Sequence, residues 1–205
     1  MLARLSSQLQ SLSQICDTEY MKYTYSIRHA DAQDAPAIAQ VQAGVWRKAY
    51  QGRVPNALIE RMEDVAERTK AWQTIFESFE ESGLGQSFVA VEDDSGVVGF
   101  GTCGPQRDDA LLDQGFSGEI SALYIAAEHQ GAGLGSGLLR FMAADLLRTG
   151  HMSAAFWVLG GNPKADRFFT QTGGLACATR SGAHGDLHET AYGWRDLAQL
   201  AGRAS

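Results

Sequence analysis

Residues 130–137 read Q-G-A-G-L-G-S-G, and this stretch decides the fold. It follows the apolar run I-S-A-L-Y-I (120–125) and precedes L-L-R-F-M-A-A-D-L-L-R (138–148). The first run has the pattern of a strand and the second that of a helix, so the glycines form a strand-to-helix turn. Small residues leave the amides of such a turn open, and the helix N-terminus behind them favours an anion. The stretch therefore predicts the close approach of a phosphate-bearing ligand.

Two familiar nucleotide motifs do not fit these glycines. In the dinucleotide pattern G-x-G-x-x-G the third glycine would fall on Ser136, and the acidic residue expected about 20 residues later is missing. The P-loop requires G-K-[ST], which the stretch lacks. A glycine-rich turn that binds nothing remains an alternative on the stretch alone.

The composition narrows the class of protein. The chain has 205 residues, of which 44% are hydrophobic and 20% charged, as in one soluble domain. It contains no run of about 18 apolar residues, and its N-terminus lacks the apolar core of a secretory signal. Three scattered cysteines are too few for a disulfide framework, and a net charge of −7 argues against nucleic acid. These features predict a cytoplasmic protein without nucleic-acid or membrane partners.

Residues 23–205 have the pattern of one α/β domain. Asp31 or Asp34 can cap the first helix, which ends near Gly52, and 105–115 reads as a polar loop. Two further helices are predicted within 56–81, one after the glycine stretch that ends at about Arg148, and one at 164–172. Strands are predicted at 23–28, 87–92, 97–103, 118–125, 153–159, 175–180 and 188–194.

Residues 1–22 form a separate extension. Leucines and Cys16 recur there at three- and four-residue steps, as on one face of a short helix. That face would pack on the domain or on a second subunit. Alternatively, Met21 is the true start of the protein.

Three segments carry a resemblance to a known family. The segment E-I-S-A-L-Y-I-A-A-E-H-Q-G-A-G-L-G (119–135) resembles the acetyl-CoA motif of the GNAT superfamily of N-acetyltransferases, Q/R-x-x-G-x-G/A. Residues 156–174 resemble the family's W-V-x-x-x-N-x-x-A-x-x-F-Y-x-x-x-G-F segment, and 46–55 resemble the turn between its first two helices. The resemblance covers about residues 23–195. It implies a single domain with a mixed, twisted sheet of about seven strands and helices on both faces.

The resemblance also implies acetyl-CoA as cosubstrate. The pyrophosphate would bind the turn amides, and the pantetheine arm would add like a strand beside 123–125, where an exposed backbone edge has unpaired polar groups. Asn162 would contact the CoA arm, although it also suits a turn before proline. The implied cofactor-binding residues are Leu123, Tyr124, Ile125, Gln130, Gly131, Ala132, Gly133, Leu134, Gly135, Ser136, Asn162 and Phe169.

The implied reaction transfers an acetyl group from a thioester to an amine. An alkylamine with a pKa near 10 is about one part in a thousand unprotonated at pH 7, a deficit of roughly 4 kcal/mol that a general base addresses. The resemblance assigns this role to Glu119, which otherwise is a solvated strand residue. The amide of Ile125 or a neighbour would stabilise the oxyanion.

The chain departs from the family where a tyrosine protonates the departing thiolate. Phe169 stands at that position and has no hydroxyl, which leaves Tyr50, Tyr124 and Tyr192 as substitutes. Trp46 and Tyr50 would line the acceptor pocket, or else belong to the core.

We therefore predict an enzyme that acetylates a small-molecule amine or a protein N-terminus. The alternative is a catalytically weak acyl-CoA-binding module of the same fold. No metal is expected, since His184 and His188 lack a convincing third ligand and the family uses none. A homodimer is common in the family.

Overall fold

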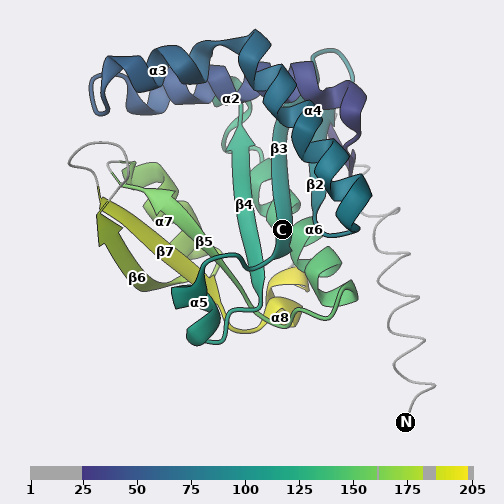
Figure 1. Ribbon diagram of the computed structural model, residues 1–205, viewed down its shortest axis with the longest axis vertical. Helices are drawn as coiled ribbons and strands as arrows, with labels where there is room; N and C mark the ends of the chain where they lie inside the picture. Colours follow the sequence, from purple (N-terminus) through teal and green to yellow (C-terminus); the bar gives the residue numbers. More distant parts are fainter. Residues whose placement is uncertain (1–24, 161, 182–187, 203–205) are drawn as a thin grey trace.

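Residues 25–160, 162–181 and 188–202 are described by the computed structural model (Figure 1). The predicted helix in 1–22, the alternative start at Met21, and Cys16 and His184 lie outside the described residues.

Seven strands form one mixed sheet in the order β1-β2-β3-β4-β5-β7-β6. Neighbours are antiparallel except β4 and β5, which run parallel. This confirms the predicted architecture. The strands are β1 (Tyr25–His29), β2 (Gln86–Glu92), β3 (Gly96–Pro105), β4 (Gly118–Ile125), β5 (Ala154–Leu159), β6 (Leu175–Ser181) and β7 (His188–Trp194).

Helices cover both faces of the sheet and bury it on each side. One face packs against α6 and α8, around Leu138, Leu139 and Met142. The other packs against α2 and α4, around Ile38, Trp72 and Phe100. The helices are α2 (Ala35–Tyr50), α3 (Asn56–Glu63), α4 (Val65–Ser82), α5 (Asp109–Asp113), α6 (Leu134–Arg148), α7 (Pro163–Gln171) and α8 (Leu197–Ala201), with 3₁₀ turns η1 (Ala32–Asp34) and η2 (Ala127–His129).

Three local predictions need correction. Residues 105–115 are not wholly a loop, because Asp108 caps the short helix α5 through the amide of Leu111. A further helix, α8, follows β7. Asp31 caps η1, whereas the carboxylate of Asp34 does not cap α2 and instead pairs with Arg28 at 2.7 Å.

Two irregularities of β4 set up the site. Thr102 pairs with Ala122 and Cys103 with Ile120, so a β-bulge leaves Ser121 without a register partner on β3. The bulge shifts the strand's alternation, and Ile120, Leu123 and Ile125 consequently all pack toward α6. On the other side, β4 and β5 pair only at Gly118–Ala154 and Glu119–Ala155. Beyond these pairs the two strands diverge, and Figure 1 shows β5 leaning away from β4.

Candidate active site

A cavity of about 280 Å³ lies where β4 and β5 diverge. Its walls come from α2 and α3, from both strands, and from α7, which brings together segments far apart in the sequence. Six residues predicted for the cofactor or acceptor site line it: Trp46, Tyr50, Leu123, Tyr124, Asn162 and Phe169. Trp46 and Tyr50, predicted to line the acceptor pocket or else to belong to the core, face this cavity and are buried, with 9% and 8% of their surface exposed.

The glycine turn stands at the carboxyl end of β4 and begins α6. Gly131 and Gly133 have φ angles of +85° and +82°, a backbone conformation that residues with a side chain rarely adopt. Gly133 is the N-cap, and neither a side-chain cap nor an acidic residue occupies the first turn of α6. The first amides of a helix lack intrahelical acceptors, so this end suits an anion.

Two contacts join the turn to its surroundings. Gln130 Nε2 donates to the carbonyl of Ile125 at 3.0 Å, tying the turn to the last residue of β4. A Cβ on Gly135 would lie 3.2 Å from the ring of Phe168, so this glycine allows α7 to pack against the start of α6. The turn residues and Ile125 do not line the cavity, but the two elements that they contact, β4 and α7, both contribute residues to its walls.

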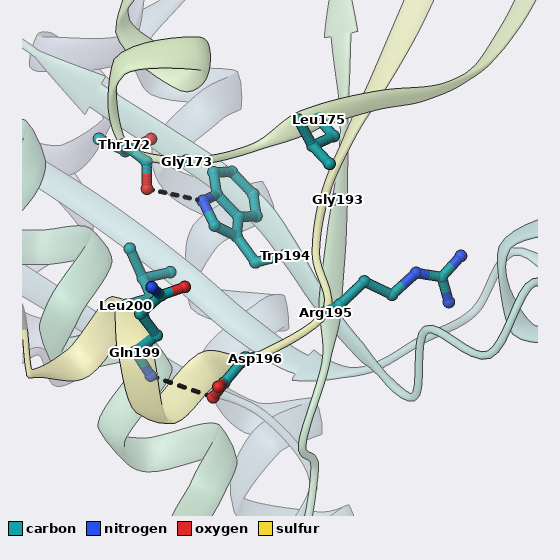
Figure 2. A pocket seen from close by; sticks show the side chains of 9 residues that line it. All are labelled: Thr172, Gly173, Leu175, Gly193, Trp194, Arg195, Asp196, Gln199 and Leu200. Carbon is teal, nitrogen blue, oxygen red and sulfur yellow. Dashed lines mark hydrogen bonds between the residues drawn. The ribbon is translucent and has the colours of Figure 1, made fainter.

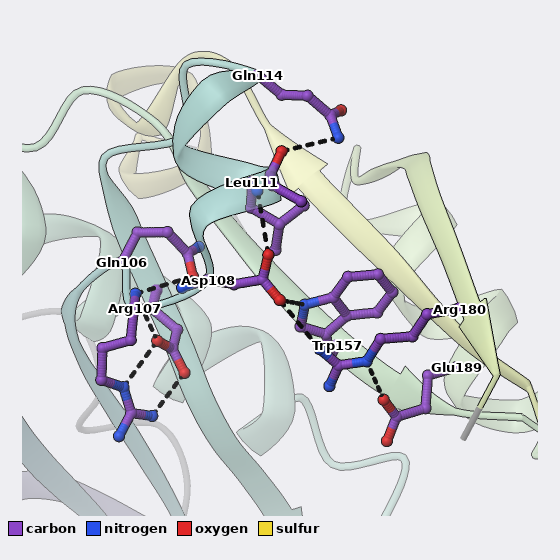
Figure 3. A network of polar contacts seen from close by, with 10 residues as sticks. Gln106, Arg107, Asp108, Leu111, Gln114, Trp157, Arg180 and Glu189 are labelled. Carbon is purple, nitrogen blue, oxygen red and sulfur yellow. Dashed lines mark hydrogen bonds and ion pairs between the residues drawn. The ribbon is translucent and has the colours of Figure 1, made fainter. Parts of the chain in front are cut away.

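Glu119 lies at the last paired position of the parallel strands, outside the cavity lining. Arg107 holds its carboxylate: Nε donates to Oε2 at 2.9 Å, Nη2 to Oε1 at 2.7 Å, and the backbone amide to Oε2 at 3.2 Å. Figure 3 shows Arg107 next to the Asp108 network described below. This ion pair raises the pKa of Arg107. The side chain of Glu119 is 18% exposed, so the carboxylate remains accessible to water.

The three substitute tyrosines differ in position. Tyr50 and Tyr124 face the cavity, whereas Tyr192 does not line it and donates to Asp166 at 3.2 Å. Burial raises the pKa of Tyr50 to about 12 and raises that of Tyr124. Burial and the Asp166 carboxylate raise the pKa of Tyr192. All three hydroxyls therefore stay protonated at neutral pH.

Phe169 and Asn162 hold α7 against the site. Phe169 is 4% exposed and packs its ring 5.6 Å from that of Tyr192, in the place where the family tyrosine was expected. Asn162 caps α7 by accepting from the amide of Ala165 at 3.3 Å, and its side chain also interacts with Tyr50. The turn role predicted for Asn162 is confirmed, and it sits on the cavity wall as well.

A smaller hollow of about 160 Å³ lies between β7, β6 and α8 (Figure 2). The indole of Trp194 donates to the carbonyl of Thr172 at 3.2 Å, and Asp196 accepts from the amide of Gln199 at 3.0 Å. The guanidinium of Arg195 stacks 4.1 Å from the ring of Phe116. These polar groups already have partners, so the hollow offers little to a ligand.

Within 25–160, 162–181 and 188–202, no cluster of three or more His, Cys, Asp or Glu side chains is arranged to hold a metal ion. In the same residues, no helix combines the length and the apolar character needed to cross a membrane.

The sheet order, the diverging β4 and β5 and the glycine turn before α6 define an α/β fold with a split between its two parallel strands. The chain belongs to the acetyltransferase (GNAT) family, whose sequence profile matches residues 46–174. An uncharacterized N-acetyltransferase of Bacillus subtilis, YuaI, is 28% identical over 176 residues, which is 85% of this chain and 95% of that protein.

Solved structures show the same fold. PaiA N-acetyltransferase of Thermoplasma acidophilum, in complex with coenzyme A, superposes with a TM-score of 0.65 at 16% identity, covering 82% of this chain and 97% of that one. YncA of Salmonella typhimurium, with its cofactor acetyl-CoA, superposes with a TM-score of 0.63 at 22% identity, covering 88% and 96%.

Sequence reasoning missed several residues of the site. Arg107 lies in a polar loop whose pattern gives no sign of its pairing with Glu119. Leu58, Arg61 and Met62 of α3 form one wall of the cavity, although their spacing indicates only an amphipathic helix.

Proposed function

We propose that the protein transfers the acetyl group of acetyl-CoA to an amine by direct attack in a ternary complex. The observation that carries the proposal is that the glycine turn before α6, the unpaired edge of β4 and the cavity beside β5 follow one another along the same strand. The pyrophosphate binds the turn amides, and the pantetheine arm pairs with the edge of β4 that β5 leaves beyond Glu119. The thioester then meets the acceptor in the cavity. The coenzyme A and acetyl-CoA complexes of PaiA and YncA support this choice of cosubstrate.

Glu119 is the general base in this proposal, and Arg107 positions it. A carboxylate offers about four acceptor sites. Arg107 occupies three of them, two on Oε2 and one on Oε1, which leaves one site on Oε1 for an ammonium proton or a bridging water. The amide of Ile125 or of a neighbour on β4 stabilises the oxyanion.

The thiolate departs without a tyrosine at Phe169. Thiolates are moderate bases, with a thiol pKa of about 8.5, so water or the substrate ammonium can supply the proton. Among the tyrosines, Tyr50 and Tyr124 can donate a proton to the thiolate because their side chains line the cavity. Phe169 also favours the second candidate, a catalytically weak acyl-CoA-binding module.

A thiol-release assay over a panel of amines separates the two candidates. We expect acetyl-CoA-dependent release with at least one amine, and a pH–rate profile that shifts in Glu119→Gln. An unchanged profile in an active pair would refute the role of Glu119. Binding of acetyl-CoA without release on any amine would favour the binding module.

We further propose that the enzyme works in the cytoplasm as a homodimer on a small amine or a peptide N-terminus. Cys103 and Cys177 are free thiols, which fits a reducing compartment. Sedimentation velocity on the full chain tests the dimer.

A further inference from the structure

The cavity has mostly apolar walls. Trp46 and Tyr50 of α2 pack with ring centroids 4.9 Å apart and ring planes tilted by 45°, and Leu58 and Met62 of α3 continue that side. Residues 156–159 of β5 form the opposite side. Such walls suit a flat or branched apolar body.

The acidic group of the lining is already neutralised. Glu189 is the one carboxylate among the described lining residues, and its Oε2 accepts from Arg180 Nε. Arg180 also donates to Asp108 at 3.0 Å and stacks 4.0 Å from the ring of Trp157. The indole of Trp157 donates to the same Asp108 oxygen, also at 3.0 Å (Figure 3). This network leaves no unpaired carboxylate in the described part of the lining to bind an additional cation.

Two polar side chains of the lining offer hydrogen-bond donors. Arg61 lines the cavity and has no hydrogen bond or ion pair within the residues that the structure describes. Tyr124 accepts from the indole of Trp46 at 3.3 Å, and the Gln42 side chain lies beside its hydroxyl. The oxygen of Gln42 is occupied by the indole of Trp72 at 2.9 Å, so its amide NH₂ faces Tyr124. Both neighbours of the Tyr124 hydroxyl are thus donors, and its own hydrogen is available to the cavity.

We infer that the acceptor is an apolar amine that also carries a carboxylate, which Arg61 and the Tyr124 hydroxyl bind. Because the Tyr124 hydrogen is then donated to that carboxylate, Tyr50 is the cavity hydroxyl that remains to assist the thiolate. The inference rests on the proposed acetyl transfer and names the substrate class of the same cavity. A monoamine with a carboxylate matches both the donors and the apolar walls. A polyamine would bring extra ammonium groups into a cavity whose carboxylate is paired, and their lost hydration would be uncompensated.

Matched amine pairs test the inference. The probes are L-phenylalanine against phenethylamine, L-tryptophan against tryptamine and L-leucine against isopentylamine, with spermidine as a polycation. We expect kcat/KM to favour the carboxylate member of at least one pair by on the order of 10- to 100-fold, the range of a charge-assisted hydrogen bond. Arg61→Gln should remove that preference. Arg47→Gln is the control, because Arg47 pairs with Glu63 and does not line the cavity.

Equal or better activity on the decarboxylated amines or on spermidine overturns the inference and leaves the proposed transfer intact. The same holds if Arg61→Gln keeps the preference. If no amine is acetylated, the proposed transfer fails, and calorimetry with N-acetylphenylalanine and N-acetylphenethylamine then decides the inference separately. Tighter binding of N-acetylphenylalanine, lost in Arg61→Gln, supports the carboxylate site, and equal binding overturns it.

Discussion

The variants Gly133→Ala and Gly150→Ala, compared with each other, distinguish a loss of acetyl-CoA binding from a loss of stability. Gly133 is the N-cap of α6 and has a φ of +82°, and Gly150 follows the same helix with a φ of +92°. An added Cβ meets nothing within 4 Å at either position. The two substitutions therefore impose the same kind of backbone strain, and only the first changes the predicted pyrophosphate site.

The structure supports equal costs in stability for the two variants. A left-handed conformation costs an L-residue about 1–2 kcal/mol, and the lower entropy of the unfolded alanine chain offsets about 0.4–1 kcal/mol. The net loss is roughly 1 kcal/mol, which lowers Tm by about 2–4 °C in a domain of this size. Differential scanning calorimetry should give similar values for Gly133→Ala and Gly150→Ala.

Their affinities for acetyl-CoA should differ. One misplaced hydrogen bond to a charged phosphate costs about 1.5–3 kcal/mol, which corresponds to about a 10- to 100-fold increase in Kd. Titration calorimetry should show this increase in Gly133→Ala and the native Kd in Gly150→Ala. Equal Kd values in the two variants would refute the pyrophosphate site at α6.

Three further predictions concern buried side chains. Phe169 is 4% exposed, so Phe169→Ala should lower the free energy of unfolding measured in urea titrations by about 3–5 kcal/mol. A loss below about 1 kcal/mol would contradict its place in the core. Cys103 is 2% exposed, and burial raises its pKa. In a chain that carries Cys16→Ser and Cys177→Ser, Cys103 should therefore react with a thiol reagent only after the protein unfolds. Rapid reaction of Cys103 in the folded protein would contradict this. The pKa of Tyr50 rises from 10.0 to about 12 on folding, so its contribution to stability is complete below pH 10 and is lost between about pH 10 and 12. Thermal unfolding across that interval should decline less steeply in Tyr50→Phe, and parallel curves would disprove the contribution.

The glycine turn and the helices around it were predictable because their signals are local. Gly133 is followed by apolar residues at helical spacing, and the D-D-S-G turn at 93–96 joins two apolar runs. The structure has a helix from Leu134 and a β2–β3 hairpin at these places. Asn162 before Pro163 likewise indicated a turn, and it caps α7.

The cavity was less predictable because it depends on contacts between distant segments. The bulge at Ser121 is a mismatch in the register of β4 against β3, and nothing in the sequence around Ser121 marks it. The pairing of Arg107 with Glu119 depends on the same two strands. Arg61 reaches the cavity because α3 packs beside α2, which a helical pattern alone does not specify.

The thermal stability of the full chain in the presence of acetyl-CoA tests the central claim most directly. A ligand at 100 times its Kd stabilises the native state by about 2.7 kcal/mol, which raises Tm by roughly 5–10 °C in a domain of this size. We predict a saturable rise in this range with acetyl-CoA. An unchanged Tm at millimolar acetyl-CoA would contradict a cofactor site formed by the glycine turn, β4 and the cavity.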